Sequence, residues 1–77
     1  MNNKIETVMV DSTAIYSAEY NLEKEEMIVY FNNESIYKYF KVPNFYWRGL
    51  FEARSKGKFL NTYVFKKFTY NKLDFND

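Results

Sequence analysis

Basic residues gather around a glycine in the second half of the chain. Lys56 and Lys58 flank Gly57, and Arg48 and Arg54 lie shortly before them. Cations beside free backbone amides at the start of a helix bind anions such as phosphate. The pattern therefore predicts a phosphate site formed by these five residues. A glycine that ends a helix, with solvated lysines on either side, is the simpler interpretation of the same residues.

Aromatic rings near these cations could stack on the base of a nucleotide, since cations meet phosphates while rings meet bases. The candidate rings are Tyr39, Trp47 and Phe59. Tyr37 and Tyr39 alternate along one predicted strand and could form a stacking platform. We favour the alternative that these two tyrosines point into the core, because helices must cover one face of the sheet and Lys38 lies on the other.

The composition argues against catalysis. The chain has no histidine and no cysteine, which excludes a Ser-His-Asp triad, imidazole acid-base chemistry and the usual zinc sites. Glu23, Glu25 and Glu26 are best explained as solvated charges of a hairpin. No glycine-rich phosphate loop or activated nucleophile is visible. We therefore predict that the protein is not an enzyme and binds no cofactor and no metal.

The net charge of +1 conceals a strong asymmetry between the two halves of the chain. Residues 1–36 carry seven acidic and two basic residues, a charge of −5, whereas residues 37–77 carry nine basic and three acidic residues, a charge of +6. Such a split can mark an anion-binding surface. It can equally reflect two solvated faces that attract each other within the fold or across a dimer.

Three segments have the alternation of β-strands, at residues 14–20, 26–31 and 34–42. A polar connection at residues 21–25 joins the first two, and a tight Asn32-Asn33 turn joins the second and third. Residues 1–11 form a short lead that could add an edge strand at residues 8–10.

The hydrophobic period changes to that of a helix after the third strand. We predict a main helix from about Pro43 to Ser55 and a second, shorter helix around residues 59–64. The expected fold is α+β, a three-stranded antiparallel meander followed by one main helix and one short helix (β-β-β-α-α). It makes one domain over residues 1–77, with a core at about 10–70, a lead at 1–9 and a tail at 71–77 whose last four residues fray.

The sheet face opposite the tyrosines carries apolar side chains that have no obvious cover: Ile28, Tyr30, Ile36 and Phe40. Either the C-terminal segment covers them through Phe65 and Phe68, or they form an interface between subunits. We favour a homo-oligomer.

Several short motifs resemble the KTSC domain. They are Tyr37-Lys38-Tyr39, then Val42-Pro43, then an aromatic helix and Ser55-Lys56-Gly57-Lys58-Phe59 with Asn61. The resemblance covers about residues 10–70. That family includes an appendage at the C-terminus of some lysyl-tRNA synthetases and small free-standing bacterial and phage proteins. The resemblance implies RNA binding, although the family's function is largely unassigned. The acidic first half and the aromatic helix of this chain depart from the family pattern.

These observations lead to two hypotheses for the function. The first is a non-catalytic binding module for a phosphate-bearing nucleotide, either RNA or a small nucleotide, held by the basic-aromatic surface. The alternative is a small phage-type protein that inhibits a host protein by docking on it, or a homo-oligomer that sequesters a nucleotide signal. No signal peptide or membrane span is visible, so we expect a cytoplasmic protein without a membrane partner.

Overall fold

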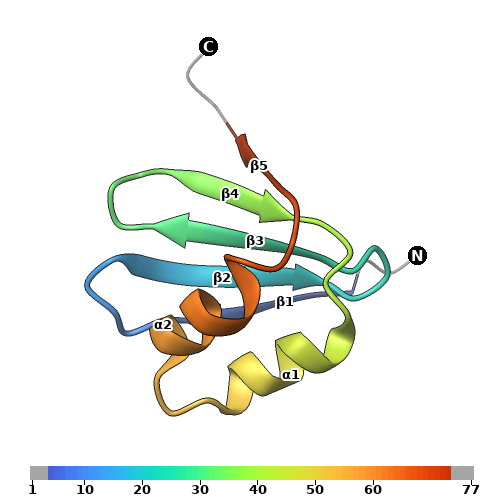
Figure 1. Ribbon diagram of the computed structural model, residues 1–77, viewed down its shortest axis with the longest axis horizontal. Helices are drawn as coiled ribbons and strands as arrows, with labels where there is room; N and C mark the ends of the chain where they lie inside the picture. Colours follow the sequence, from blue (N-terminus) through green and yellow to red (C-terminus); the bar gives the residue numbers. More distant parts are fainter. Residues whose placement is uncertain (1–3, 74–77) are drawn as a thin grey trace.

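The computed structural model describes residues 4–73 of the chain. Figure 1 shows strands and helices that follow one another in this order: β1 (Ile5–Met9), β2 (Ile15–Asn21), β3 (Glu26–Phe31), β4 (Ile36–Tyr39), α1 (Asn44–Glu52), α2 (Lys56–Phe59), the π-helical segment η1 (Leu60–Val64) and β5 (Tyr70–Leu73).

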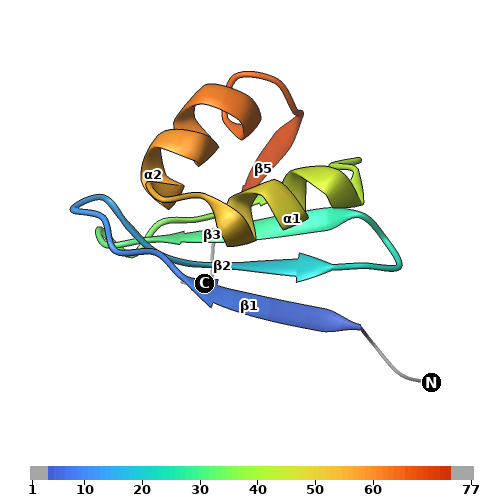
Figure 2. The same ribbon diagram turned by 90° about the horizontal axis from the view of Figure 1, so that it is seen from below.

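All five strands belong to one antiparallel sheet, in the order β1-β2-β3-β4-β5. The helical segments lie between β4 and β5 in the chain and cover one face of the sheet (Figure 2). The domain therefore has two layers, with the core between them. We call the face under the helices the inner face and the opposite one the outer face.

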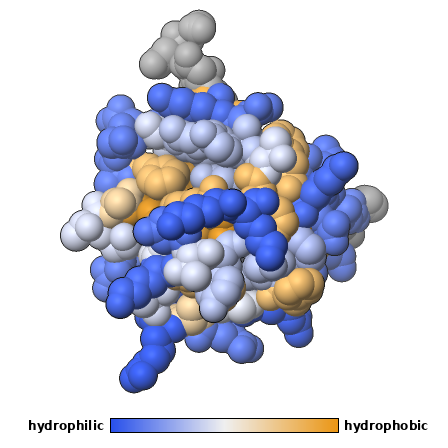
Figure 3. Space-filling model, viewed as in Figure 1, coloured by the Kyte–Doolittle hydropathy of each residue, from blue (hydrophilic) through white to orange (hydrophobic). Residues whose placement is uncertain are grey.

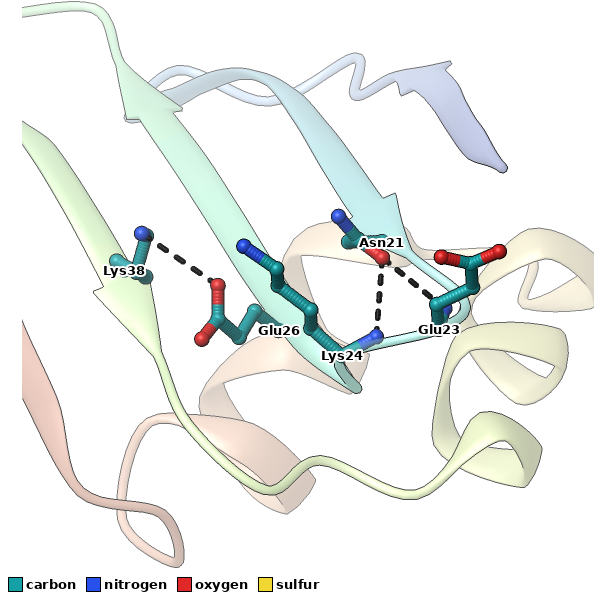
Figure 4. A network of polar contacts seen from close by, with 5 residues as sticks. All are labelled: Asn21, Glu23, Lys24, Glu26 and Lys38. Atoms are coloured by element: carbon teal, nitrogen blue, oxygen red, sulfur yellow. Dashed lines mark hydrogen bonds and ion pairs between the residues drawn. The ribbon is translucent and has the colours of Figure 1, made fainter. Parts of the chain in front are cut away.

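The hairpin between β2 and β3 is held by the side chain of Asn21. Its Oδ1 atom accepts hydrogen bonds of 3.0 Å from the backbone amides of Glu23 and Lys24 (Figure 4). Glu25 then takes a left-handed conformation with φ 57°, which brings the chain back into β3. A backbone hydrogen bond of 2.8 Å from the amide of Glu25 to the carbonyl of Asn21 closes the same turn. The asparagine bonds add to it, and they explain why a polar pentapeptide connects two strands here.

The next turn, between β3 and β4, contains the predicted pair Asn32-Asn33. The left-handed residue is Glu34, at φ 73°, and not one of the asparagines. Asn33 instead accepts a hydrogen bond from the amide of Ser35 through its side chain. The turn was thus located correctly, while its backbone geometry differs from the expected one.

The core is centred on Tyr20 of β2 and Trp47 of α1. Their rings stack with centroids 5.3 Å apart, and both side chains are buried. The Tyr20 hydroxyl donates a hydrogen bond of 2.6 Å to the carbonyl oxygen of Val42. Val42 lies just before Pro43, where the chain leaves the sheet and enters α1. The side chain of Tyr20 therefore fixes both the point at which the chain enters α1 and the position of Trp47 within that helix.

The predicted three-stranded β-β-β-α-α fold is wrong, because residues 4–73 already form a sheet of five strands. The N-terminal segment that we treated as a lead pairs along its whole described length with β2, from Ile5 opposite Asn21 to Met9 opposite Ser17. Four of the five β1 residues are exposed, so this edge strand lacks the alternation of buried apolar residues that reveals β2 and β3.

The fifth strand comes from the segment that we assigned to the tail. Tyr70 lies opposite Tyr39 on β4, and its ring packs against those of Tyr37 and Tyr39. β5 is short and returns to the sheet only after the helices, so no local pattern indicates its partner. The prediction that residues 74–77 fray lies outside the described residues.

The helical region also differs in its boundaries from the predictions. α1 ends at Glu52, because Ala53 adopts an extended conformation with ψ 141°. The second helix begins at Lys56 and continues without a break into η1, where the predicted short helix lies. Gly57 is inside α2 and has no positive φ, so the interpretation as a glycine that ends a helix is wrong.

The outer face has no helix over it within residues 4–73 (Figure 2). It includes an ion pair of 3.4 Å between Glu26 and Lys38, shown in Figure 4. Phe65 and Phe68 do not cover this face, because they pack on the inner side against Tyr39 and Tyr46. The interface predicted from Ile28, Tyr30, Ile36 and Phe40, all of which are half-buried, stays a prediction.

The hydroxyl of Tyr20 provides a first test of this packing. We expect Tyr20→Phe to lower the free energy of unfolding by about 1–3 kcal/mol, because the buried carbonyl of Val42 would lose its donor. Urea unfolding followed by circular dichroism measures this change. Tyr16→Phe is the matched control, since Tyr16 is exposed and should tolerate the loss. Equal stability of the two variants would contradict the proposed role of Tyr20.

Alkaline pH provides a second test. Burial raises the pKa of Tyr20 and that of Tyr39 to about 12, above the ordinary value of 10.0. The folded protein therefore keeps protons that the unfolded chain loses above pH 10. Stability should be unaffected by these groups below about pH 10 and should fall between about pH 10 and 12. Urea midpoints measured across this range should decline less steeply in Tyr39→Phe than in the wild type.

Candidate functional site

A cleft of about 530 Å³ opens between the loop that precedes β2 and the first turn of α2. We call it the Ser12 cleft. Its floor is apolar and is formed by Ile15, Phe31 and Phe65. Polar and charged side chains surround that floor, and they belong to Asp11, Ser12, Ser55, Lys58 and Asn61. An apolar floor with a few convergent polar groups is the usual form of a small-molecule site.

The loop side of the cleft is anchored by Asn32 from the β3–β4 turn. Its side-chain amide donates to the carbonyl oxygens of Ser12, at 3.2 Å, and Thr13, at 2.8 Å. Its backbone amide donates to the carbonyl of Ala14 at 2.9 Å. Three hydrogen bonds to three consecutive residues hold this loop in place beside the sheet. The loop can therefore present Ser12 in a defined position.

The floor depends on packing between distant parts of the chain. Phe31, at the end of β3, packs on Phe65 with ring centroids 5.6 Å apart, and Phe65 in turn stacks on Tyr39. Ile15 lies at an irregularity of the β2–β3 pairing, where the register shifts between Ile15 and Ser17. Such a bulge redirects a side chain, and here Ile15 is buried at the base of the cleft.

Gly57 allows α2 to approach the loop closely. A β-carbon at this position would lie 3.1 Å from Oγ of Ser12 and 3.3 Å from its Cβ. The hydroxyl of Ser12 accepts a hydrogen bond from the amide of Ala14, and that of Ser55 accepts one from the amide of Lys58. Each hydroxyl keeps its own proton to donate, so both serines can still bind an acceptor on a ligand.

The structure does not bring the four predicted cations together. Of these four residues, which all lie within residues 4–73, Lys58 alone lines the Ser12 cleft. Lys56 donates through Nζ to the carbonyl of Ala53 at 2.9 Å, and so satisfies the end of α1. Arg54 is exposed in the connection between the helices, and Arg48 lines a separate cleft of about 300 Å³ beside Glu6 and Glu52.

The three predicted stacking rings also lie outside the Ser12 cleft. Tyr39 is 4% exposed and Trp47 is 2% exposed, so both are core residues, as we favoured for Tyr39. The indole of Trp47 donates to Oε1 of Glu6 at 2.8 Å. Phe59 is half-buried and packs over Gly49 and against Tyr63, with ring centroids 4.8 Å apart in the latter pair.

The aromatic residues that the cleft does contain are Phe31 and Phe65, and neither was among the predicted site residues. Phe31 ends a strand and Phe65 follows a helix, so their proximity depends on how α2 and η1 lie on the sheet. Ser55, Gly57 and Asn61 were noted in the sequence as parts of a motif. The sequence signal for Ser12 is weak: it belongs to the polar segment Asp11-Ser12-Thr13, which separates β1 from β2.

The part of the chain that the structure describes lacks both a cluster of metal ligands and a membrane-spanning helix. Within residues 4–73, no three His, Cys, Asp or Glu side chains lie close enough together to hold a metal ion. None of the helices in the same range is long and apolar enough to cross a membrane.

The fold and the cleft define a small α+β domain in which an antiparallel sheet carries helices on one face. The family model of the KTSC domain matches residues 11–68, and the chain therefore belongs to the KTSC domain family. The matched range includes both sides of the Ser12 cleft, from Asp11 to Phe65.

A solved structure supports this assignment. The chain is similar to the crystal structure of a KTSC domain protein from Yersinia pestis, with a TM-score of 0.82 and 26% sequence identity. The similarity covers 91% of this chain and 99% of the other. Among curated proteins, no sequence matches the chain.

The contact between Gly49 and Phe59 leads to a third prediction. A β-carbon at position 49 would lie 2.8 Å from Cζ of Phe59, whose ring is also held by Tyr63. We expect Gly49→Ala to lower stability by about 1–3 kcal/mol through overpacking, although alanine favours a helix by about 1 kcal/mol over glycine.

A double-mutant cycle isolates this contact. In a Phe59→Ala background the ring is absent, so Gly49→Ala should become neutral or stabilising. Unfolding in urea measures all four proteins. If Gly49→Ala has the same effect in both backgrounds, the glycine is not required by the ring of Phe59.

Proposed function

We propose that this domain is a non-catalytic binding module whose Ser12 cleft holds a phosphate-bearing nucleotide, either a small nucleotide or an unpaired nucleotide of RNA. The observation that carries the proposal is the convergence of an aromatic floor, two serine hydroxyls and a lysine in one cleft of about 530 Å³. This volume lies within the range that is usual for small-molecule sites, about 300–1,000 Å³.

Each part of the cleft matches one part of such a ligand. In this proposal the base lies on Phe31 and Phe65, because aromatic side chains stack on bases of any sequence. The phosphate accepts hydrogen bonds from the hydroxyls of Ser12 and Ser55 and from the ammonium group of Lys58. Asp11 at the rim accepts a hydrogen bond from a sugar hydroxyl.

The charge of the cleft favours a ligand with a single phosphate. Lys58 supplies one positive charge, and Asp11 on the opposite side supplies one negative charge. A triphosphate would place further negative charge near Asp11, where repulsion costs binding energy. A monophosphate, or one linkage of an RNA strand, avoids this conflict.

The surroundings of the serines support binding and not nucleophilic catalysis. An activated serine requires a base within hydrogen-bonding distance of its oxygen. In this structure the hydrogen bonds to Oγ of Ser12 and of Ser55 come from backbone amides. These amides fix the orientation of the side chains and cannot remove a proton.

Lys58 gives the direct test. We expect Lys58→Ala to weaken binding of a nucleoside monophosphate about ten- to a hundredfold, because a charge-assisted hydrogen bond is lost. Calorimetric titration at low salt, with each of the four nucleoside monophosphates and with short single-stranded RNAs, measures the affinity. Lys66→Ala is the matched control, since Lys66 is exposed and does not line the cleft.

The two variants should have the same melting temperature as the wild type, so that a loss of affinity reflects the cleft alone. Binding should also weaken as salt is raised, since a phosphate contact is electrostatic. The proposal fails if no nucleotide binds, or if Lys58→Ala and Lys66→Ala have equal effects.

A second candidate function is docking on a protein partner, as expected of a phage-type inhibitor. Exposed rings on the helices favour it: Phe45 is 67% exposed, Phe51 is 53% exposed and Tyr63 is 50% exposed. Figure 3 shows separate hydrophobic patches divided by hydrophilic side chains on the helix-covered face. Binding through such rings would respond little to salt, which distinguishes it from phosphate binding.

A further inference from the structure

The first strand lies at the border of the described part of the sheet. Within residues 4–73, β1 pairs with β2 alone, and Figure 2 shows it as the outermost strand. Ile5 is 51% exposed and Met9 is 59% exposed. A strand edge of this kind presents unpaired backbone groups that can pair with another strand.

The hydrogen bonds at both ends of β1 identify which backbone groups are free. The amide of Leu22 donates to the carbonyl of Lys4 at 2.9 Å, and the amide of Val10 donates to the carbonyl of Tyr16 at 3.0 Å. Residues 4 and 10 therefore point their backbone groups toward β2. Because the direction alternates along an antiparallel strand, residues 6 and 8 do the same, while 5, 7 and 9 point away.

This set of free groups is complementary to itself. When two copies of β1 lie antiparallel about a two-fold axis at Thr7, Thr7 faces the partner's Thr7 and Ile5 faces the partner's Met9. Every residue with outward backbone groups then meets another such residue, and each of these facing pairs can exchange two hydrogen bonds. No shift or bulge is needed to bring the two edges into register.

The side chains fit the same pairing. Ile5, Thr7 and Met9 all project to the outer face, because alternate residues of a strand share a face. Ile5 would cover the partner's Met9, and the two threonines would meet at the centre, a pair that is favourable across strands. Natural edges are commonly protected by charge or proline. These three residues have neither, and the charged residue of β1, Glu6, projects to the inner face, where it accepts a hydrogen bond from Trp47.

We propose that two copies of this chain join through β1, Thr7 against Thr7, into one continuous antiparallel sheet with five strands from each copy. A two-fold axis perpendicular to the sheet leaves the helices of both copies on the same side. The two outer faces then form one extended surface. The interface is short, so the dimer should be weak and its population should depend on concentration.

A cysteine at the centre of the interface tests the register. The chain has no cysteine, so Thr7→Cys introduces a single thiol. The Cα atoms of a hydrogen-bonded antiparallel pair are about 5.5 Å apart. The β-carbons of such a pair lie too far apart for an unstrained disulfide but close enough for a short thiol-to-thiol crosslinker such as a bismaleimide. We expect such a crosslinker to convert most of this variant to a covalent dimer. Thr62→Cys, exposed on η1, is the control and should stay mainly monomeric. Equal crosslinking of both variants overturns the proposal.

Proline at the same position tests the backbone pairing. The amide of Thr7 points away from β2, so Thr7→Pro removes a donor of the interface and none of the internal ladder. We expect an unchanged fold and a dissociation constant raised at least about tenfold, measured by sedimentation equilibrium up to about 1 mM protein. Thr7→Val keeps the amide and should keep the dimer.

Two results of this experiment overturn the proposal. The first is a wild-type protein that is monomeric throughout the concentration range. The second is a dimer that survives Thr7→Pro but dissociates in Ile36→Glu, which would assign the contact to the outer face and not to the edge of β1.

Discussion

The hydrogen bond from the buried hydroxyl of Tyr20 to the carbonyl of Val42 is the contact on which the rest of the structure depends. Val42 lies where the chain passes from the sheet to α1, so this bond sets the point at which the helix begins. The stacking of Tyr20 on Trp47 then orients the helix on the sheet. The position of α1 in turn determines where α2 and η1 can pack, and thus where the Ser12 cleft opens.

The sequence was sufficient for the centre of the fold and insufficient for its edges. β2, β3 and β4 could be predicted because their side chains alternate between a buried and a solvated face. β1 was expected only as a possible edge strand at residues 8–10, and it in fact spans Ile5–Met9, since an edge strand that packs few side chains has no such pattern. β5 was not predicted at all, because it pairs with a strand far away in the chain. The start of α1 after Pro43 was predictable from the local properties of proline.

The candidate site was predictable only in part for the same physical reason. Gly57 and Lys58 belong to one local motif and do line the cleft. Tyr39 and Trp47 were candidates because their ring types suit stacking, but ring type does not distinguish a core residue from a surface residue. Phe31 and Phe65 come together only after the helices pack on the sheet. A binding surface assembled from four separate segments is thus visible in three dimensions and not in the sequence.

The late return of β5 to the sheet has a consequence for the order of folding. The strands β1 to β4 are joined by short turns, so each pair can form with little loss of chain entropy. Ile36 pairs with Leu73, and the whole helical region must be closed into a loop before this contact can form. We therefore expect the edge of β4 to stay unpaired in the folding domain until β5 docks on it. The pairing of β5 with β4 is then the final step of assembly.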